Sequence, residues 1–329
     1  MKIHILISIQ FQGMHADNLN IKSMNKESLV INRAYCPVCR SKERSIIISI
    51  KHDSPEFLNF IKFERFYGKS FYDTYYNGPS RELLFEIAEC KACNFLYLTE
   101  VLNDYGMGLL YNEWLDKELL KPYYANMPYS LYEETMLRVF KKRFRKKDKV
   151  NLLDFGAGYG NFCRIATKFG FNTHAFDLSA DKNEHMNNMG VTILNNLDKY
   201  KGFFDFIYVN QVFEHLSDPA GVLKDLQECL SDDGYIYIAT PDVGAAKKTF
   251  KKEGLSQTFF GYLSPHQHIN GFTNKPLKLL GVNAGLRPLS MSDFVKFYNI
   301  SLNIADLKFL IKKTLKSSNF STSLFFKKN

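Results

Sequence analysis

From about residue 150 onward, short apolar runs alternate with segments whose apolar residues recur at helical spacing. The apolar runs cover residues 152–155, 172–176, 191–194, 204–210 and 235–239. Strands that alternate with helices form a parallel sheet that is covered by helices on both faces. The pattern therefore predicts an α/β fold with a doubly wound, mostly parallel sheet.

A glycine-rich turn follows the first of these predicted strands. The sequence there reads Leu152-Leu153-Asp154-Phe155-Gly156-Ala157-Gly158-Tyr159-Gly160-Asn161. Glycine is needed where the backbone adopts angles that a Cβ opposes, and where a nucleoside lies against the main chain. A dinucleotide-binding turn has the spacing G-x-G-x-x-G, whereas here Asn161 stands at the third glycine position. An acid before the turn also suits a cationic amino-acid ligand and would repel a pyrophosphate.

A second acid, Asp177, ends the second predicted strand. In a βαβ unit such an acid, about 20 residues after the glycine turn, faces the ribose hydroxyls of a bound nucleoside. With Asp154, Gly156, Gly158 and Gly160 before it, this arrangement resembles motif I and the next strand of the class I S-adenosylmethionine-dependent methyltransferases. The resemblance implies a Rossmann-like fold and S-adenosylmethionine as the cofactor.

The fourth predicted strand extends the resemblance. It begins the stretch FDFIYVNQVFEHLSDP at residues 204–219, which is similar to the strand-four signature of small-molecule and sugar methyltransferases. The resemblance covers the region from residue 135 to residue 290. It implies that Asp154 lies near the methionine amino group and that Asp177 binds the ribose. Further cofactor-binding residues implied by the fold follow strands two, three and four: Leu178, Asn195, Asn196, Asn210 and Gln211.

Methyl transfer also needs an aligned nucleophile and, for many acceptors, a base that removes a proton. His215 follows strand four, which in this fold lies beside the methyl group, and histidine titrates near neutrality. Glu214 precedes it, and His268 lies in the loop after strand five that closes over the acceptor in this fold. These three residues are the candidate catalytic groups. A structural or helix-capping role is the alternative for each histidine.

The N-terminal half carries two C-x-x-C pairs, Cys36 with Cys39 and Cys90 with Cys93. Four thiolates form a ligand set that structural zinc prefers. The alternatives are disulfides, a redox pair or unrelated thiols, and disulfides are not expected because the apolar start of the chain lacks a cleavage site. The aromatic and apolar flanks predict that each pair ends a β-hairpin. The stretches YCPVC and ECKACNFLYL resemble the N-terminal zinc module of bacterial sugar methyltransferases, which implies one structural zinc ion.

Aromatic residues are dense between the two cysteine pairs. They are Phe57, Phe60, Phe63, Phe66, Tyr67, Phe71, Tyr72, Tyr75 and Tyr76. Such a stretch either forms the core of a small module or stacks on a sugar or base. We expect a core, with Tyr72, Tyr75 and Tyr76 the best candidates for exposed binding residues.

The formal net charge of +9 is concentrated in two segments, residues 141–149 and 301–329. A local run of this kind is typical of a solvated face rather than a nucleic-acid interface. In the second segment Ile304, Leu307 and Leu310 recur at helical spacing among lysines. This tail suits either peripheral contact with an anionic membrane or packing on the domain. No apolar run approaches the ~20 residues of a transmembrane helix, and we expect a cytoplasmic protein.

These patterns predict the following organisation along the chain of 329 residues. Residues 1–30 form an N-terminal extension that is a candidate for disorder, and residues 31–100 form a zinc-binding module. Residues 101–145 form a helical linker or lid, residues 146–295 the cofactor-binding methyltransferase domain, and residues 296–329 the basic amphipathic tail.

Three functions are compatible with this organisation. The favoured one is methyl transfer to a small molecule, with a nucleotide-linked sugar or surface-polysaccharide precursor as the expected substrate. An RNA methyltransferase is the second, and nucleic acid is the less favoured partner because Asn210-Gln211-Val212-Phe213 lacks the Asn/Asp-Pro-Pro-aromatic motif of base-amino methyltransferases. The third is a non-catalytic zinc scaffold with a degenerate methyltransferase fold.

Overall fold

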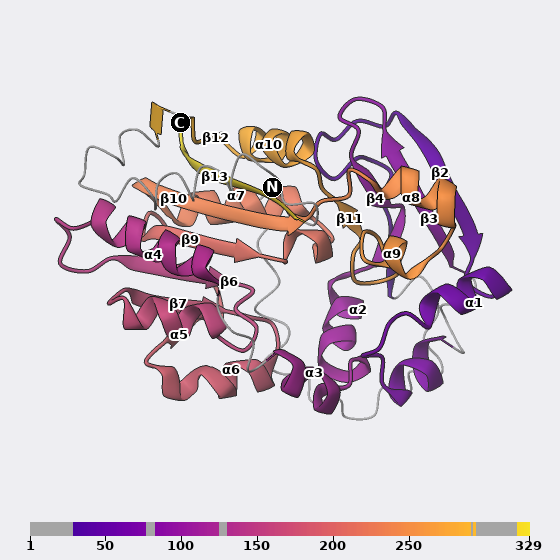
Figure 1. The fold of residues 1–329 in the computed structure, drawn as a ribbon, viewed down its shortest axis with the longest axis horizontal. Coiled ribbons are helices and arrows are strands. Elements are labelled where there is room, and N and C mark those ends of the chain that lie inside the picture. The colour runs from indigo at the N-terminus through magenta and orange to yellow at the C-terminus, as the bar shows by residue number, and fades with distance from the viewer. Residues whose placement is uncertain (1–28, 77–82, 125–129, 291, 294–320) are drawn as a thin grey trace. The chain divides into compact units, whose positions relative to one another are not determined.

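The computed structural model describes residues 29–76, 83–124, 130–290, 292–293 and 321–329 (Figure 1). The chain divides into two compact units. The parallel-sheet unit comprises the described parts of residues 121–213, 220–240 and 277–329. The cysteine unit comprises the described parts of residues 1–120, together with residues 214–219 and 241–276. Two later segments of the chain therefore return to the unit that its N-terminal half begins.

The parallel-sheet unit is built on a seven-stranded sheet in the order β12-β13-β10-β9-β6-β7-β8. Its strands are β6 (Asn151–Phe155), β7 (Asn172–Phe176), β8 (Thr192–Ile193), β9 (Phe204–Asn210), β10 (Leu230–Pro241), β12 (Leu286–Pro288) and β13 (Ser321–Lys328). The neighbours from β10 through β9, β6 and β7 to β8 are parallel. The prediction of a Rossmann-like, mostly parallel sheet is confirmed.

Both faces of this sheet are covered, as the continuous apolar sequence of β9 requires. On one face, Phe206 stacks on Phe140 of α4 (Leu131–Arg143) with ring centroids 4.3 Å apart. Tyr208 stacks on Phe162 of α5 (Asn161–Lys168) at 3.6 Å. Ile207 and Val209, which alternate with these residues and so point the other way, are fully buried as well.

The carboxyl ends of the central strands meet at one edge of the sheet. Phe155 of β6 lies opposite both Phe176 of β7 and Val209 of β9, and Asn210 lies opposite Ala239 of β10. The helices that follow β7 and β9 along the chain are α6 (Ala180–Met186) and α7 (Pro219–Cys229). In open α/β sheets, ligands bind outside this edge.

Strand β13 was not predicted from the sequence. It pairs antiparallel with β12 and lies beside β10 in the sheet. Leu324, Phe325 and Phe326 are buried in it, and Phe326 packs on Gly281 of α10 (Asn274–Asn283). Residues 304–310, on which the prediction of an amphipathic tail helix rests, lie outside the described residues, as do residues 1–28 of the expected N-terminal extension.

The cysteine unit contains a four-stranded sheet in the order β11-β4-β3-β2. Its strands are β2 (Arg44–Lys51), β3 (Leu84–Cys90), β4 (Leu96–Leu98) and β11 (Asn270–Gly271), and each neighbouring pair is antiparallel. A separate antiparallel pair joins β1 (Val30–Asn32) to β5 (Glu100–Leu102). The turn at Cys90–Cys93 joins β3 to β4 as a hairpin, as predicted. The turn at Cys36–Cys39 does not end a hairpin, because β1 pairs with β5 and β2 pairs with β3.

The aromatic stretch between the cysteine pairs supplies the core of this unit, as expected. Phe57 and Phe60 of α1 (Pro55–Ile61) and Phe71 of the π-helical turn Phe71–Tyr76 are fully buried. Tyr72 and Tyr76 are only partly buried against them. The other helices are α2 (Asp104–Leu109), the π-helical turn Leu110–Trp114, α3 (Lys117–Tyr124), α8 (Ala246–Glu253) and α9 (Gln257–Phe260). Among the helices in the described residues, none is both long enough and apolar enough to span a bilayer.

Candidate functional site

The glycine turn after β6 is folded so that its backbone is open to a ligand. Gly156 and Gly158 have φ angles of +77° and +56°, in the left-handed region that favours glycine. Around a Cβ placed on Gly158, no atom of the described residues lies within 4 Å, whereas a Cβ on Gly156 would collide with Val212. The two glycines therefore serve different purposes. Gly156 allows close packing inside the protein, and Gly158 leaves its outer face accessible.

Asp177 fixes the conformation of this turn. The amide of Gly158 donates a 2.8 Å hydrogen bond to Oδ2 of Asp177, and the amide of Ser179 donates to Oδ1 at 3.0 Å. The ammonium group of Lys182 lies 3.5 Å from the same Oδ1. The structure thus brings together the glycine turn and the acid that the sequence singled out separately. No side chain projects from the bend of the backbone at Gly158, so a nucleoside can lie against the main chain there.

Asp154 lies in the interior of the sheet. Its side chain is 3% exposed, and the thiol of Cys163 donates a 3.2 Å hydrogen bond to Oδ2. Burial raises the pKa of Asp154 to about 7, and the charges of Glu133 and Asp177 act in the same direction. A nearby cation would favour ionisation of this carboxyl group, so the site has the chemistry to recognise an ammonium group.

The other predicted cofactor residues follow the ends of neighbouring strands. Leu178 is 45% exposed beside Asp177, and Asn195 and Asn196 come just after β8. Asn210 ends β9 and is exposed. Gln211 has a φ of +57°, and its amide donates to the carbonyl oxygen of Ala239 at 2.9 Å. Register and strand ends therefore place all of these positions along the carboxyl edge of the sheet.

The four predicted zinc ligands converge in the cysteine unit. The Sγ atoms of Cys36 and Cys93 are 3.6 Å apart, those of Cys39 and Cys90 are 3.4 Å apart, and all four lie within 4.8 Å of one another. All six cysteines of the chain are free thiols, so the disulfide alternative is absent from the structure. The hydrogen bond with Cys93 lowers the pKa of Cys36 to about 5, and the same contact raises the pKa of Cys93. Four sulfurs at this spacing suit a tetrahedral metal ion.

Glu214, His215 and His268, the predicted catalytic residues, form a cluster of their own in the cysteine unit. One ligand atom from each lies within 4.8 Å of the others. The imidazole rings of His215 and His268 have centroids 5.1 Å apart. Glu214 is 1% exposed, and burial raises its pKa to about 8. The structure brings these residues together from the Phe213–His215 turn and from the loop after α9.

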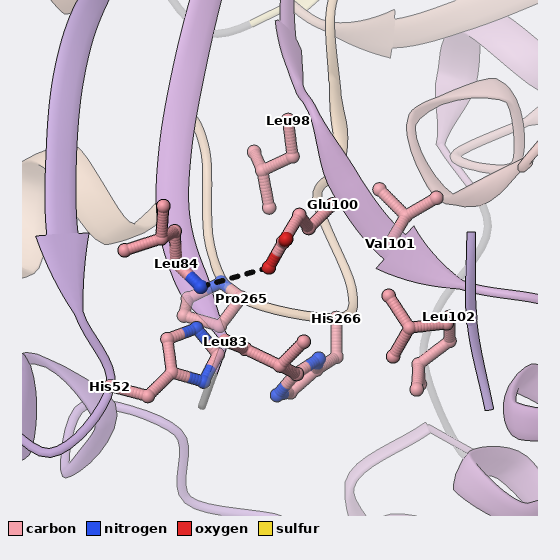
Figure 2. Close-up of a pocket in the computed structure, with 10 residues that line it drawn as sticks. His52, Leu83, Leu84, Leu98, Glu100, Val101, Leu102, Pro265 and His266 are labelled. Carbon is pink, nitrogen blue, oxygen red and sulfur yellow. Dashed lines mark hydrogen bonds between the residues drawn. The ribbon is translucent and has the colours of Figure 1, made fainter. Parts of the chain in front are cut away.

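A small pocket elsewhere in the cysteine unit is core rather than a substrate site (Figure 2). It is lined by His52, Glu100, His266 and neighbouring apolar residues, and Oε2 of Glu100 accepts a hydrogen bond from the amide of Leu84. Its volume of about 10 Å³ suits roughly one water molecule. Burial lowers the pKa of His266 to about 3, so this histidine stays neutral.

Several residues that hold these groups in place were not predicted from the sequence. Val212 packs on Gly156, and Cys163 donates to Asp154. Arg33 donates from Nη1 to Oδ1 of Asn270 at 2.7 Å and from Nη2 to the carbonyl oxygen of Leu216 at 3.3 Å, so it joins the segment before Cys36 to the segment that carries His215. The available signal is weak, because each of these residues meets a partner that is distant in the sequence.

The chain was compared with known protein families. A methyltransferase-domain family model matches residues 123–291, just over half of the chain. The chain therefore belongs to this family and is an S-adenosylmethionine-dependent methyltransferase. The matched residues include the glycine turn, Asp177 and the carboxyl edge of the parallel sheet. Curated protein sequences yielded no match.

Solved methyltransferase structures resemble parts of this chain at low identity. The plantazolicin methyltransferase BamL, in complex with a triazolic desmethylPZN analog and S-adenosylhomocysteine, is 16% identical, with a TM-score of 0.45 over 64% of this chain and 89% of that chain. A methyltransferase from Mesorhizobium loti is 15% identical, with a TM-score of 0.38 over 60% of this chain and 99% of that chain. The 1,6-didemethyltoxoflavin-N1-methyltransferase of Burkholderia thailandensis is 16% identical, with a TM-score of 0.39 over 60% and 79%.

Proposed function

We propose that this methyltransferase acts on a small-molecule acceptor, and that the acceptor is a nucleotide-linked sugar or a surface-polysaccharide precursor. The observation that carries the methyl-transfer part is the open glycine turn held by Asp177. Two features favour the acceptor class: the stretch FDFIYVNQVFEHLSDP and the four-cysteine cluster, both of which resemble bacterial sugar methyltransferases.

When bound, S-adenosylmethionine supplies an electrophilic methyl group on a sulfonium centre with a good leaving group. In our proposal Gly156 and Gly160 shape the turn, the open backbone at Gly158 lets the nucleoside lie close, and Asp177 accepts hydrogen bonds from the ribose hydroxyls. Asp154 balances the charge of the methionine ammonium group.

Around the rest of the cofactor, Leu178, Asn195 and Asn196 border the adenine in this proposal, and Asn210 and Gln211 border the methionine portion. Support for these roles comes from their common position along the carboxyl edge of the sheet. The pairs Asn195–Asn196 and Asn210–Gln211 offer amide groups that both donate and accept hydrogen bonds. Such groups suit the edge of an adenine ring and a carboxylate.

We further propose that His215 removes the proton from the acceptor. Its Nδ1 lies 2.8 Å from the carbonyl oxygen of Gln267, which fixes the proton on Nδ1 and directs the basic lone pair to Nε2. The Nδ1 of His268 is oriented in the same way by the carbonyl oxygen of Gly261 at 3.2 Å. Glu214 completes the group, with Oε1 3.8 Å from Nε2 of His215.

We assign the four-cysteine cluster a structural zinc ion. The converging sulfurs support this assignment, and so does the position of the cluster in the fold. The turn at Cys90–Cys93 lies between β3 and β4, and the carbonyl oxygen of Phe95 accepts from the amide of Cys90 at 2.9 Å. A metal ion there would join this hairpin to the segment that precedes β2. All four ligands would then be thiolates, which leaves no open position for substrate.

The test is an acceptor screen with purified protein and S-adenosylmethionine. Nucleotide-sugar pools are analysed by mass spectrometry for the gain of one methyl group. His215→Ala should lower turnover by about a hundredfold, the usual scale for a lost general base, while affinity for S-adenosylhomocysteine is kept. His185→Ala, which removes a histidine of α6, is the control.

The competing acceptor is RNA, and it has a distinct signature. A protein that neutralises many phosphates binds RNA with an affinity that falls steeply as salt rises. Methyl incorporation into RNA, together with such a steep salt dependence, would replace the small-molecule acceptor by RNA.

A further inference from the structure

The cluster of Glu214, His215 and His268 has a property that proton transfer does not require. Both oxygens of the Glu214 carboxyl group are buried and make no hydrogen bond with the described residues. A buried carboxyl group without a hydrogen-bond partner is costly even when it is protonated, and buried acids are ordinarily paired or bind metals. The nearest basic atom is Nε2 of His215, 3.8 Å from Oε1.

Both histidines are oriented as metal ligands are. A metal-ligating histidine almost always donates its second ring N–H to a carbonyl oxygen or a carboxylate. Here the Nδ1 atoms of His215 and His268 lie 2.8 Å and 3.2 Å from the carbonyl oxygens of Gln267 and Gly261. Each ring therefore carries its lone pair on Nε2, and one ligand atom from each of the three residues lies within 4.8 Å of the others.

The backbone already joins the two segments that carry these ligands. The amide of Ile269 donates to the carbonyl oxygen of Glu214 at 2.8 Å. The side chain of Asn270 donates to the carbonyl oxygen of Leu216 at 2.7 Å. Ligands around a tetrahedral zinc ion at about 2.0–2.1 Å lie roughly 3.3 Å apart. The 3.8 Å between Glu214 and His215 therefore needs only a small side-chain adjustment to accept an ion.

We propose that Glu214, His215 and His268 form a binding site for a divalent first-row transition metal, separate from the four-cysteine cluster. Two imidazoles and one carboxylate are the ligands of open zinc sites and of facial-triad iron sites, which keep a coordination position for another molecule. The nitrogen ligands favour Zn²⁺ or Fe²⁺ over Mg²⁺, which prefers oxygen ligands and octahedral geometry. The Nε2 lone pair of His215 can accept a proton or bind the ion, but it cannot do both at once.

The experiment measures metal binding without cofactor or acceptor, so it is independent of the proposed function. Tag-free protein is stripped with a chelator, and Zn²⁺ is titrated in the presence of a competing indicator. We expect a site that persists in Cys36→Ser and is lost in Glu214→Gln and in His268→Ala. Loss of a group that hydrogen-bonds to a metal ligand costs about 10–100-fold in metal affinity, so loss of a ligand itself should cost at least a hundredfold.

Three controls accompany the titration. His185→Ala removes a histidine outside the cluster and should leave the stoichiometry unchanged. Mg²⁺ should not displace Zn²⁺ from the site. Glu214→Gln and His268→Ala should keep the zinc of the four-cysteine cluster, which reports that the cysteine unit is folded. The proposal is overturned if no zinc site outside the four cysteines is found, or if that site survives both Glu214→Gln and His268→Ala.

Discussion

The amide of Gly158 donates a 2.8 Å hydrogen bond to Oδ2 of Asp177, so the glycine turn and the ribose-facing acid form one structural element. Gly158→Ala should weaken binding of S-adenosylhomocysteine at least tenfold, because the added Cβ would point into the open space beside the turn. Its backbone, at a φ of +56°, should also cost about 1–2 kcal/mol of stability for an L-residue. Calorimetric titration gives the affinity and urea unfolding gives the stability.

The chain offers a matched control for this variant. Gly202 has a φ of +65°, and no atom of the described residues lies within 4 Å of a Cβ placed there. It precedes β9 and so lies at the amino end of that strand, the opposite end from Asn210. Gly202→Ala should lose similar stability and keep its affinity for S-adenosylhomocysteine. Equal loss of affinity in both variants would show that strain alone, and not the cofactor, explains the effect.

Asp154 should make the stability of the cofactor-free protein depend on pH. Its folded-state pKa of about 7 lies above the ordinary value of 3.8, so the folded protein holds the proton more tightly than the unfolded chain. The contribution of Asp154 to stability is therefore fully present below about pH 4, falls as pH rises from about 4 to 7, and is constant above that range. The pKa difference corresponds to about 4 kcal/mol at most. Urea unfolding of the wild type should show this slope, and Asp154→Asn should lack it.

The same carboxyl group should link cofactor binding to proton release. If the ammonium group of the cofactor lies near Asp154, binding at about pH 6 ionises the carboxyl, because a neighbouring cation lowers its pKa. Calorimetry in buffers of different ionisation enthalpy should detect this proton in the wild type and not in Asp154→Asn. An equal heat difference between buffers in both proteins would contradict the assignment of Asp154.

Zinc in the four-cysteine cluster should be lost from Cys36→Ser. Metal analysis should then show about one fewer zinc per chain, since three thiolates no longer complete the shell. Unfolding of the cysteine unit should begin at lower temperature, because metal binding contributes to folding. Cys229→Ala, at a buried thiol outside the cluster, is the control and should keep its zinc. Wild-type protein in which both C-x-x-C turns are ordered and no zinc is bound would refute the assignment.

Arg33 should position the segment that carries His215. Its Nη1 donates to Asn270, its Nη2 lies 3.3 Å from the carbonyl oxygen of Leu216, and burial lowers its pKa to about 9. Arg33→Met should lower the free energy of unfolding by about 1.5–3 kcal/mol, the scale of hydrogen bonds from a charged group. Turnover should fall while affinity for S-adenosylhomocysteine is kept.

The control for Arg33 is a cation at the surface of the same unit. Lys247 lies 2.6 Å from Oε1 of Glu89, with its side chain 54% exposed. Lys247→Met should change the free energy of unfolding by about 0–1 kcal/mol, as exposed ion pairs do, and should leave turnover unchanged. Unaltered turnover in Arg33→Met would show that the arginine only stabilises the unit.

The sequence alone determined the alternating strands and helices, the glycine turn and the acid after β7. Each of these depends on neighbours within about one βαβ unit: Asp154, Gly158 and Asp177 belong to consecutive elements of a single crossover. The two cysteine pairs could also be recognised from the sequence, because each C-x-x-C motif is only four residues long and its thiolates are typical zinc ligands. Apolar periodicity and glycine spacing are local properties, so they can be recognised in the sequence itself.

The tertiary structure alone decided which distant segments meet. The Ser321–Lys328 segment became a strand because β10 and β12 supply its neighbours in the sheet. Residues 241–276 return to the cysteine unit through β11, which pairs with β4. That return brings His268 beside Glu214 and His215, and it places the carbonyl oxygens of Gly261 and Gln267 against their rings. The strand-four stretch identified Glu214 and His215 as candidates, but the contacts themselves depend on chain closure over long loops and on side-chain packing.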